Sequence, residues 1–141
     1  MIDKIQAYSF DEISIGKTEQ FTIVVEEKLV NNFAEISGDF NPLHMDENYA
    51  KTTKFEKRVC HGMLLASLLS RLIGMNVPGK NALYFSQSLN FRLPCFIGDK
   101  VTVIGEVIEK HHATKIITLK TTIINQNGKC LVDGLAKVIV R

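Results

Sequence analysis

The stretch His61–Gly79, HGMLLASLLSRLIGMNVPG, decides the fold of this chain. Its leucine, isoleucine and methionine residues cover nearly every face of a helix about 16 residues and ~24 Å long, and a helix that is apolar all round is buried. Pro78-Gly79 ends the helix, which is too short and too interrupted to span a membrane. The stretch therefore predicts the central helix of a soluble domain.

The part of the chain that follows this helix alternates between apolar and polar residues, which is typical of strands. Four segments share the pattern: 82–93, 100–110, 115–125 and 129–140. In the first of them the candidate inward positions are Leu83, Phe85, Leu89 and Phe91, and in the second they are Val101, Val103, Gly105 and Val107. Short turns at 111–113 and at Asn127-Gly128 join the later segments, and Asn-Gly is a strong hairpin signal. Long strands with short turns predict an α+β fold in which an antiparallel sheet wraps around the central helix.

The segment before the central helix predicts shorter helices separated by a turn. A helix over 26–36 is expected to end at Gly38, because glycine most easily adopts the left-handed cap conformation. The Asn41-Pro42 step requires extended or turn geometry. Asp46 is placed to cap a second short helix over 47–51.

Composition limits the class of protein. At 141 residues, with 45% hydrophobic residues and a net charge of +2, the chain is expected to be one domain spanning 1–141. The basic residues form no run, which argues against a nucleic-acid partner. The three cysteines are scattered, and the N-terminal residues contain no apolar signal-peptide segment. We therefore expect a cytoplasmic protein, with no disulfide framework and no membrane segment.

The motif SGDFNPLH, Ser37–His44, contains a carboxylate and an imidazole five residues apart. Asp-X-Asn-Pro is common turn chemistry, so the motif on its own is better explained as a turn than as a catalytic pair. The kink at Pro42 can bring Asp39 and His44 together, and the preceding helix can shield the pair from water. Such a pair can hold a water molecule and act in general acid–base catalysis.

A charge stabiliser for that chemistry lies at the start of the central helix. Free N–H groups at a helix N-terminus attract negative charge, and Gly62 has no side chain to keep a carbonyl oxygen away from its N–H. A metal site is the rival interpretation, with Asp39, His44, Cys60 and His61 as its candidate ligands. None of these residues shows a compact ligand spacing, so no metal is predicted.

Three segments together resemble the MaoC-like, (R)-specific enoyl-CoA hydratases: FAEISGDFNPLHMDENYA (33–50), FEKRVCHGMLLASLLSRL (55–72) and YFSQSLNFRLP (84–94). The resemblance implies a hot dog fold that dimerises through its sheet edges. It also implies that Asp39 and His44 are the catalytic pair and that the Gly62 amide binds the thioester carbonyl. Ser70 matches a position that helps to order the polar network of the site, although a hydroxyl bonded to its own helix backbone explains it equally well.

The activity that the resemblance implies is reversible hydration of trans-2-enoyl-CoA to (3R)-3-hydroxyacyl-CoA without a cofactor. The substrate carrier is coenzyme A or an acyl carrier protein, and the protein is expected to be a homodimer or a larger homo-oligomer. Two alternatives remain: a hot dog acyl-CoA thioesterase and a non-catalytic acyl-thioester-binding module. Four basic residues are candidates either for phosphate contacts or for a solvated surface: Lys54, Lys57, Arg58 and Arg92.

Overall fold

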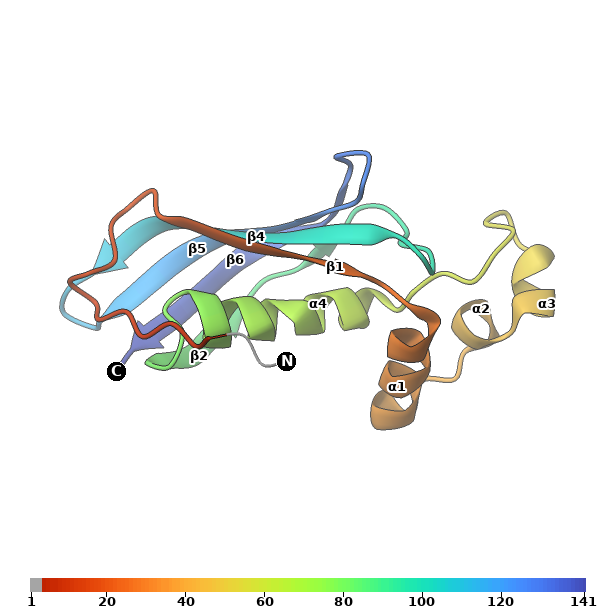
Figure 1. Cartoon of the computed structure of the whole chain (residues 1–141), viewed down its shortest axis with the longest axis horizontal. Coiled ribbons are helices and arrows are strands. Elements are labelled where there is room, and N and C mark those ends of the chain that lie inside the picture. The colour runs from red at the N-terminus through yellow and green to blue at the C-terminus, as the bar shows by residue number, and fades with distance from the viewer. Residues whose placement is uncertain (1–3) are drawn as a thin grey trace.

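The computed structural model describes residues 4–141 as an antiparallel sheet packed on a central helix (Figure 1). Within these residues the sheet contains six strands: β1 (Thr18–Val24), β2 (Ala82–Gln87), β3 (Asn90–Phe91), β4 (Lys100–His111), β5 (Ile116–Ile124) and β6 (Cys130–Val140). Their order is β1-β4-β5-β6-β2, with β3 paired to β6. The prediction of an α+β fold with a sheet around one helix is confirmed.

The central helix consists of α4 (Gly62–Arg71) followed directly by the π-helix η1 (Leu72–Asn76). Leu65, Leu69 and Leu72 are buried against the sheet. The expectation that the helix is buried on every side is wrong, because Met63 is 55% exposed. The exposed side of α4 carries Met63, Ser67 and Ser70, so the sheet of one chain covers only part of the helix surface.

Strand β4 shows how the sheet accepts the helix. The predicted inward residues Val101, Val103 and Val107 are buried, and Gly105 lies between them. A Cβ atom at Gly105 would lie 2.8 Å from the Cδ2 atom of Leu72, which is too close for a real contact. Glycine at this position therefore lets the central helix approach the middle of the sheet.

The first predicted strand is divided, and most of its predicted inward residues are exposed. Strand β2 ends at Gln87, and beyond it the ladder is irregular: the Ser88 N–H still donates to the Leu135 carbonyl, but the Leu135 N–H donates to Ser88 Oγ over 2.9 Å. Leu89 packs against the core as predicted. The prediction is wrong for three residues, which are 53–62% exposed: Leu83, Phe85 and Phe91. Strand β2 is an edge strand, and in a single chain no second layer covers it.

Three helices lie beyond one end of the sheet: α1 (Glu27–Ser37), α2 (Pro42–Met45) and α3 (Glu47–Lys51) (Figure 1). The Asp46 side chain caps α3 by accepting a hydrogen bond from the Tyr49 N–H over 3.1 Å, as predicted. None of the helices in residues 4–141 has the length and apolar character needed to cross a membrane. The motif that contains Asp39 and His44 runs from the end of α1 into α2 and lies beside the start of α4.

Candidate active site

Asp39 lies in the turn between α1 and α2. Gly38 ends α1 in the left-handed conformation, with φ of 79°, and its N–H donates to the Ala34 carbonyl over 2.8 Å. The Oδ1 atom of Asp39 accepts a hydrogen bond from the Asn41 N–H over 3.1 Å. The Oδ2 atom faces His44. The carboxylate thus stabilises the turn with one oxygen and presents the other to the imidazole.

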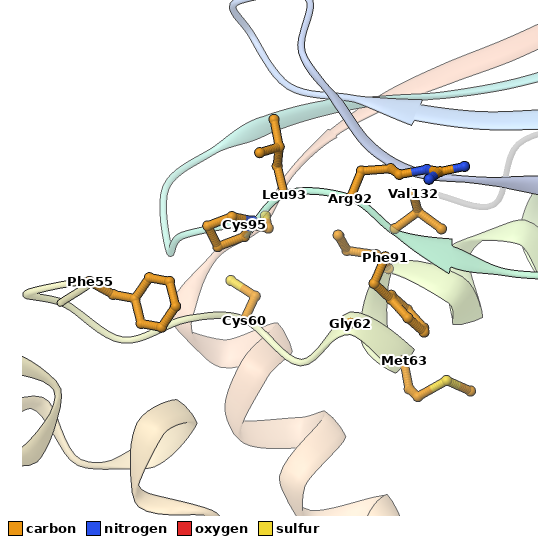
Figure 2. Close-up of a pocket in the computed structure, with 11 residues that line it drawn as sticks. Phe55, Cys60, Gly62, Met63, Phe91, Arg92, Leu93, Cys95 and Val132 are labelled. Carbon is orange, nitrogen blue, oxygen red and sulfur yellow. The ribbon is translucent and has the colours of Figure 1, made fainter. Parts of the chain in front are cut away.

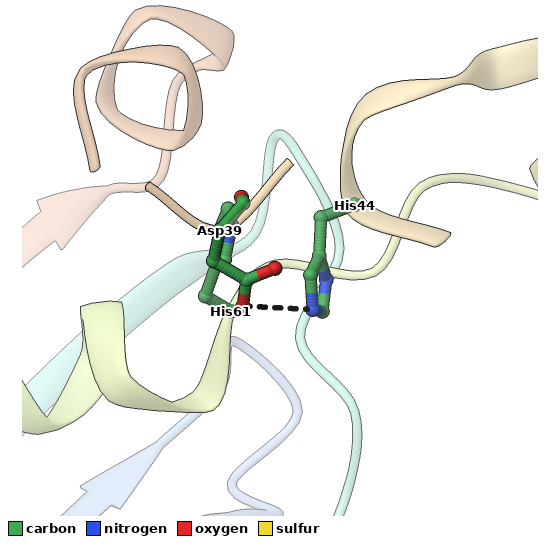
Figure 3. Close-up of side chains that lie close together, drawn as sticks. All are labelled: Asp39, His44 and His61. Carbon is green, nitrogen blue, oxygen red and sulfur yellow. Dashed lines mark hydrogen bonds and ion pairs between the residues drawn. The ribbon is translucent and has the colours of Figure 1, made fainter. Parts of the chain in front are cut away.

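His44 lies on α2, which starts at an Asn41 cap whose Oδ1 atom accepts from the Leu43 N–H over 3.0 Å. The Nδ1 atom of His44 lies 2.6 Å from the Val59 carbonyl oxygen, and because a carbonyl only accepts, Nδ1 carries the proton. In the neutral ring Nε2 therefore holds a lone pair, and it lies 4.0 Å from Asp39 Oδ2 (Figure 3). Two acceptors at this separation can share one water molecule that donates to both.

The two side chains differ in their exposure to solvent. The Asp39 side chain is 48% exposed and the His44 side chain is 17% exposed. The expectation that the preceding helix shields the pair therefore holds for His44 but is wrong for Asp39. Exclusion of water from the carboxylate requires a bound substrate or a further chain.

His61, the residue before α4, contacts both members of the pair. Its Nε2–H donates to the Asp39 backbone carbonyl over 2.9 Å. Its ring stacks on the His44 ring with the centroids 4.1 Å apart, and the Phe33 ring lies 4.9 Å away on a tilted plane. The residue is only 2% exposed, and its Nδ1 atom has no hydrogen-bond partner among the described residues. From the sequence, His61 is a candidate metal ligand and part of the helix start at Gly62, because spacing along the chain does not reveal a contact with His44 across 17 residues.

The geometry of these residues bears on the metal interpretation. Asp39, His44 and His61 each offer a ligand atom within 4.8 Å of the others, whereas Cys60 is not in this group. One nitrogen of each imidazole is already hydrogen-bonded to a carbonyl. The two rings are stacked with their planes 30° apart, so the remaining lone pairs lie in separate, nearly parallel planes, which disfavours a shared ion. A tetrahedral site needs converging ligands, so this arrangement fits an acid–base pair better than a metal centre.

Arg58 holds His44 from the opposite side. Its Nε–H donates to the His44 carbonyl over 2.6 Å, while its two terminal nitrogens donate to Glu27 Oε1 over 2.8 Å and Asn31 Oδ1 over 3.0 Å. The guanidinium group of Arg58 therefore links α2 to α1 through these hydrogen bonds. The expectation of a solvated side chain is wrong for Arg58, because its side chain is 11% exposed, whereas a phosphate contact stays a prediction that competes with these three hydrogen bonds.

Gly62 begins α4, and no side chain caps this helix start. A Cβ atom at this position would lie 2.7 Å from the Cδ1 atom of Phe91, so the phenyl ring fills the space that a side chain would need. Gly62, Leu65 and Phe91 line an open cavity of about 460 Å³ (Figure 2). The wall is mainly apolar, and the uncapped helix start places N–H dipoles at its edge.

Ser70 lies apart from this group of residues. It follows Gly62 by eight residues, which is about 12 Å along a helix. It lines a shallow apolar hollow beside Phe33 and Tyr84. The structure thus brings Asp39, His44 and the residue before Gly62 into contact, but within one chain it does not bring Ser70 to the pair.

Comparison with known proteins identifies the family of this chain. Residues 12–128 match the model of the MaoC like domain. The chain belongs to the MaoC-like family. It is 51% identical over 130 residues to an (R)-specific enoyl-CoA hydratase of Aeromonas caviae, a match that covers 92% of this chain and 97% of the relative. A second (R)-specific enoyl-CoA hydratase, from Rhodospirillum rubrum, is 39% identical over 142 residues and covers 98% and 95% of the two chains.

Solved structures of this MaoC-like group share the fold. The (R)-hydratase of A. caviae superposes with a TM-score of 0.89 at 43% identity, covering 92% of this chain and 98% of that one. An unliganded R-hydratase from Pseudomonas aeruginosa gives a TM-score of 0.94 at 36% identity, covering 98% and 88%. The predicted hot dog fold is confirmed.

Proposed function

We propose that this MaoC-like protein is an (R)-specific enoyl-CoA hydratase that adds water to trans-2-enoyl-CoA and catalyses the reverse dehydration. The observation that carries the proposal is the approach of Asp39 Oδ2 to His44 Nε2, 4.0 Å apart, with the tautomer of His44 fixed by Val59. Two relatives of nearly the same length carry this activity in their names.

The mechanism follows from the acceptors in the site. A water molecule held between Asp39 and His44 donates one O–H to each, so its oxygen lone pair is free to attack C3 of the enoyl group. As the C3–O bond forms, one proton passes to the pair and the C2=C3 electrons move toward the thioester oxygen. The Gly62 N–H and the helix dipole stabilise that negative charge. Return of the proton to C2 completes the addition of one water molecule.

The roles of the remaining site residues are part of the same proposal. Asp39 and His44 are assigned as the catalytic pair and Gly62 as the oxyanion donor. Ser70 is assigned to the polar network of the site. Within one chain it lies in the hollow beside Phe33, so this role requires a substrate or a second copy that extends the network to Ser70. The cavity beside Gly62 is assigned to the substrate chain, because its wall is apolar and it reaches the helix start.

The protein is proposed to work in the cytoplasm as a single domain that forms a homodimer or a larger homo-oligomer. Strand β2 supports the oligomer, because it lies at the sheet edge and carries exposed Leu83 and Phe85.

Three free cysteines support a reducing compartment. Coenzyme A is the proposed carrier, and a relative in Arabidopsis thaliana that is named for acyl-carrier-protein substrates makes the carrier a point to test.

The decisive experiment follows crotonyl-CoA with the purified protein. Loss of the conjugated thioester absorbance without release of free thiol, together with a product of 3R configuration, is the expected result. Release of thiol without hydration would replace the proposal with a thioesterase. A protein that binds acyl-CoA but does neither would be the non-catalytic module. Repeating the assay with crotonyl-acyl carrier protein decides the carrier.

A further inference from the structure

A pair of cysteines on the wall of the cavity has no part in the hydration mechanism. Cys60 and Cys95 are 3% and 2% exposed, and both are free. They lie on facing segments beside Gly62 (Figure 2). Both residues belong to the wall of the open cavity of about 460 Å³, and each presents only a small part of its surface there.

The backbone places the two residues directly opposite each other. Val59 and Phe96 form an antiparallel bridge, and one step along each segment the Cys60 N–H donates to the Cys95 carbonyl over 2.7 Å. Opposed residues of an antiparallel pair have Cα atoms ~4.5–5.5 Å apart and side chains on the same face. A disulfide needs Cα atoms ~4.4–6.8 Å apart, so the two thiols can be joined with little movement of the backbone.

The side chains are in contact as well. The pKa of the Cys95 thiol is raised, mainly by its hydrogen bond with the Cys60 thiol and secondly by burial. The raised pKa disfavours Cys95 as the first nucleophile, and joining Cys60 to another sulfur removes the thiol whose hydrogen bond raises that pKa most.

We propose that Cys60 and Cys95 form a dithiol modification site for low-molecular-weight disulfides, and that coenzyme A disulfide is the member of this class that the cavity delivers. The second part rests on the proposed function. A CoA thioester whose carbonyl oxygen binds the Gly62 N–H carries its sulfur, one bond from the carbonyl carbon, into the cavity whose wall includes Cys60 and Cys95. The disulfide of the same carrier brings its S–S bond to that place.

The exchange proceeds in two balanced steps. The Cys60 thiolate attacks one sulfur of the disulfide, forms a mixed disulfide and releases one CoA thiolate. The Cys95 thiolate then attacks the Cys60 sulfur, forms the Cys60–Cys95 disulfide and releases the second CoA thiolate. The two protons lost by the cysteines end on the two CoA thiols, so the protein is oxidised by two electrons and one coenzyme A disulfide is reduced.

Formation of the disulfide is expected to stop hydration. Cys60 lies between Val59, whose carbonyl fixes His44, and His61, which contacts Asp39 and His44. Drawing the sulfurs from contact to about 2.05 Å requires only a small shift of this strip toward Cys95, but the strip holds His44 and His61. A small displacement of catalytic groups can cost ~10²-fold in rate, so activity should fall to less than about a tenth.

The test incubates the fully reduced protein with coenzyme A disulfide or, at equal concentration, with glutathione disulfide. Free thiols per denatured chain are expected to fall from three to one, and peptide mapping should find Cys60 joined to Cys95. Hydratase activity should fall in step with the lost thiols and return with dithiothreitol. Loss of thiols should be at least about tenfold faster with coenzyme A disulfide than with glutathione disulfide. Saturating butyryl-CoA should slow the reaction with coenzyme A disulfide.

Three cysteine variants complete the design. Cys130→Ser is the matched control, since Cys130 lies on β6 near Asp133 and away from the pair, and it should cross-link like the unchanged protein. Cys95→Ala should stop at a mixed disulfide that adds one CoA to the mass, and Cys60→Ala should resist modification. Should either variant fail to fold, peptide mapping of the unchanged protein still decides the matter.

Specific results would overturn the proposal. A folded, reduced protein that keeps all three thiols, or a cross-link that includes Cys130, rules out the dithiol site. Equal rates with both disulfides, without protection by butyryl-CoA, rule out delivery by the CoA cavity. Failure of the reduced protein to hydrate crotonyl-CoA rejects the proposed function instead, and the thiol count decides the dithiol site separately.

Discussion

The ring of His61 stacks on the ring of His44 with their centroids 4.1 Å apart and their planes at 30°. The same His61 ring donates a hydrogen bond to the backbone carbonyl of Asp39. One buried side chain therefore positions both members of the proposed catalytic pair. Since Gly62 directly follows His61, the same contact links the pair to the start of α4.

Two substitutions of His61 separate its two contacts. His61→Phe keeps a ring against His44 but loses the donor to Asp39, and His61→Gln keeps a donor but loses the stacked ring. Each is expected to lower kcat by about 10- to 100-fold, with a smaller change in KM, because the catalytic groups are displaced while the cavity is retained. Steady-state hydration of crotonyl-CoA measures both constants.

A matched thermal unfolding curve distinguishes positioning from loss of structure. If both His61 variants kept the kcat of the unchanged protein, His61 would be a core residue only. A parallel fall of kcat and of the folded fraction would lead to the same conclusion.

Removing either member of the pair should abolish most turnover. Asp39→Asn and His44→Ala are each expected to lower kcat by ~10²–10⁴-fold, the usual contribution of general acid–base catalysis. Asn retains an Oδ1 atom for the hydrogen bond from the Asn41 N–H, so Asp39→Asn should change the free energy of unfolding by less than about 1 kcal/mol.

The control for this pair is Asp46→Asn, the same chemical change at the cap of α3. Asparagine caps helices as well as aspartate does, so activity and stability should both stay close to those of the unchanged protein. Near-normal turnover in Asp39→Asn or His44→Ala would reject the assignment of the pair.

The parts of this protein that sequence predicts are those set by local chemistry. Gly38 and Asp46 were predicted to end and cap helices, and both do so through contacts within a few residues. Alternation identified the strands, but it could not show whether a second layer covers them, which is why exposed Phe85 was predicted to face inward. The contacts of Arg58 and His61 with the motif cross 14 and 22 residues of sequence, and no spacing rule predicts them.

The close approach of Phe91 to Gly62 predicts a steric effect that can be separated from catalysis. Gly62→Ala would place a Cβ atom 2.7 Å from the Phe91 ring and should cost about 1–3 kcal/mol of unfolding free energy as well as most activity. Adding Phe91→Leu should recover stability, because the ring that obstructs the new methyl group is gone. Chemical denaturation and the hydration assay test the single and double variants.

Activity measurements show whether glycine is needed at position 62 for access of the carbonyl oxygen to the amide or only for packing against Phe91. If the methyl group also blocks the carbonyl oxygen from the amide at position 62, the double variant stays slow although it is stable again. Full recovery of kcat would instead show that Gly62 matters for packing only.

The hydrogen bonds of the Arg58 guanidinium group predict a further effect on stability and activity. Arg58→Lys keeps the positive charge but cannot donate at once to the His44 carbonyl, Glu27 and Asn31. We expect a loss of ~1–3 kcal/mol in the free energy of unfolding and a fall in kcat, since α2 and His44 are no longer tied to α1. Glu27→Gln should change both quantities much less, because its carboxylate is 64% exposed and surface ion pairs contribute little. Equal effects of the two substitutions would mean that the ion pair, and not the hydrogen bond to the His44 carbonyl, is what holds the imidazole in place.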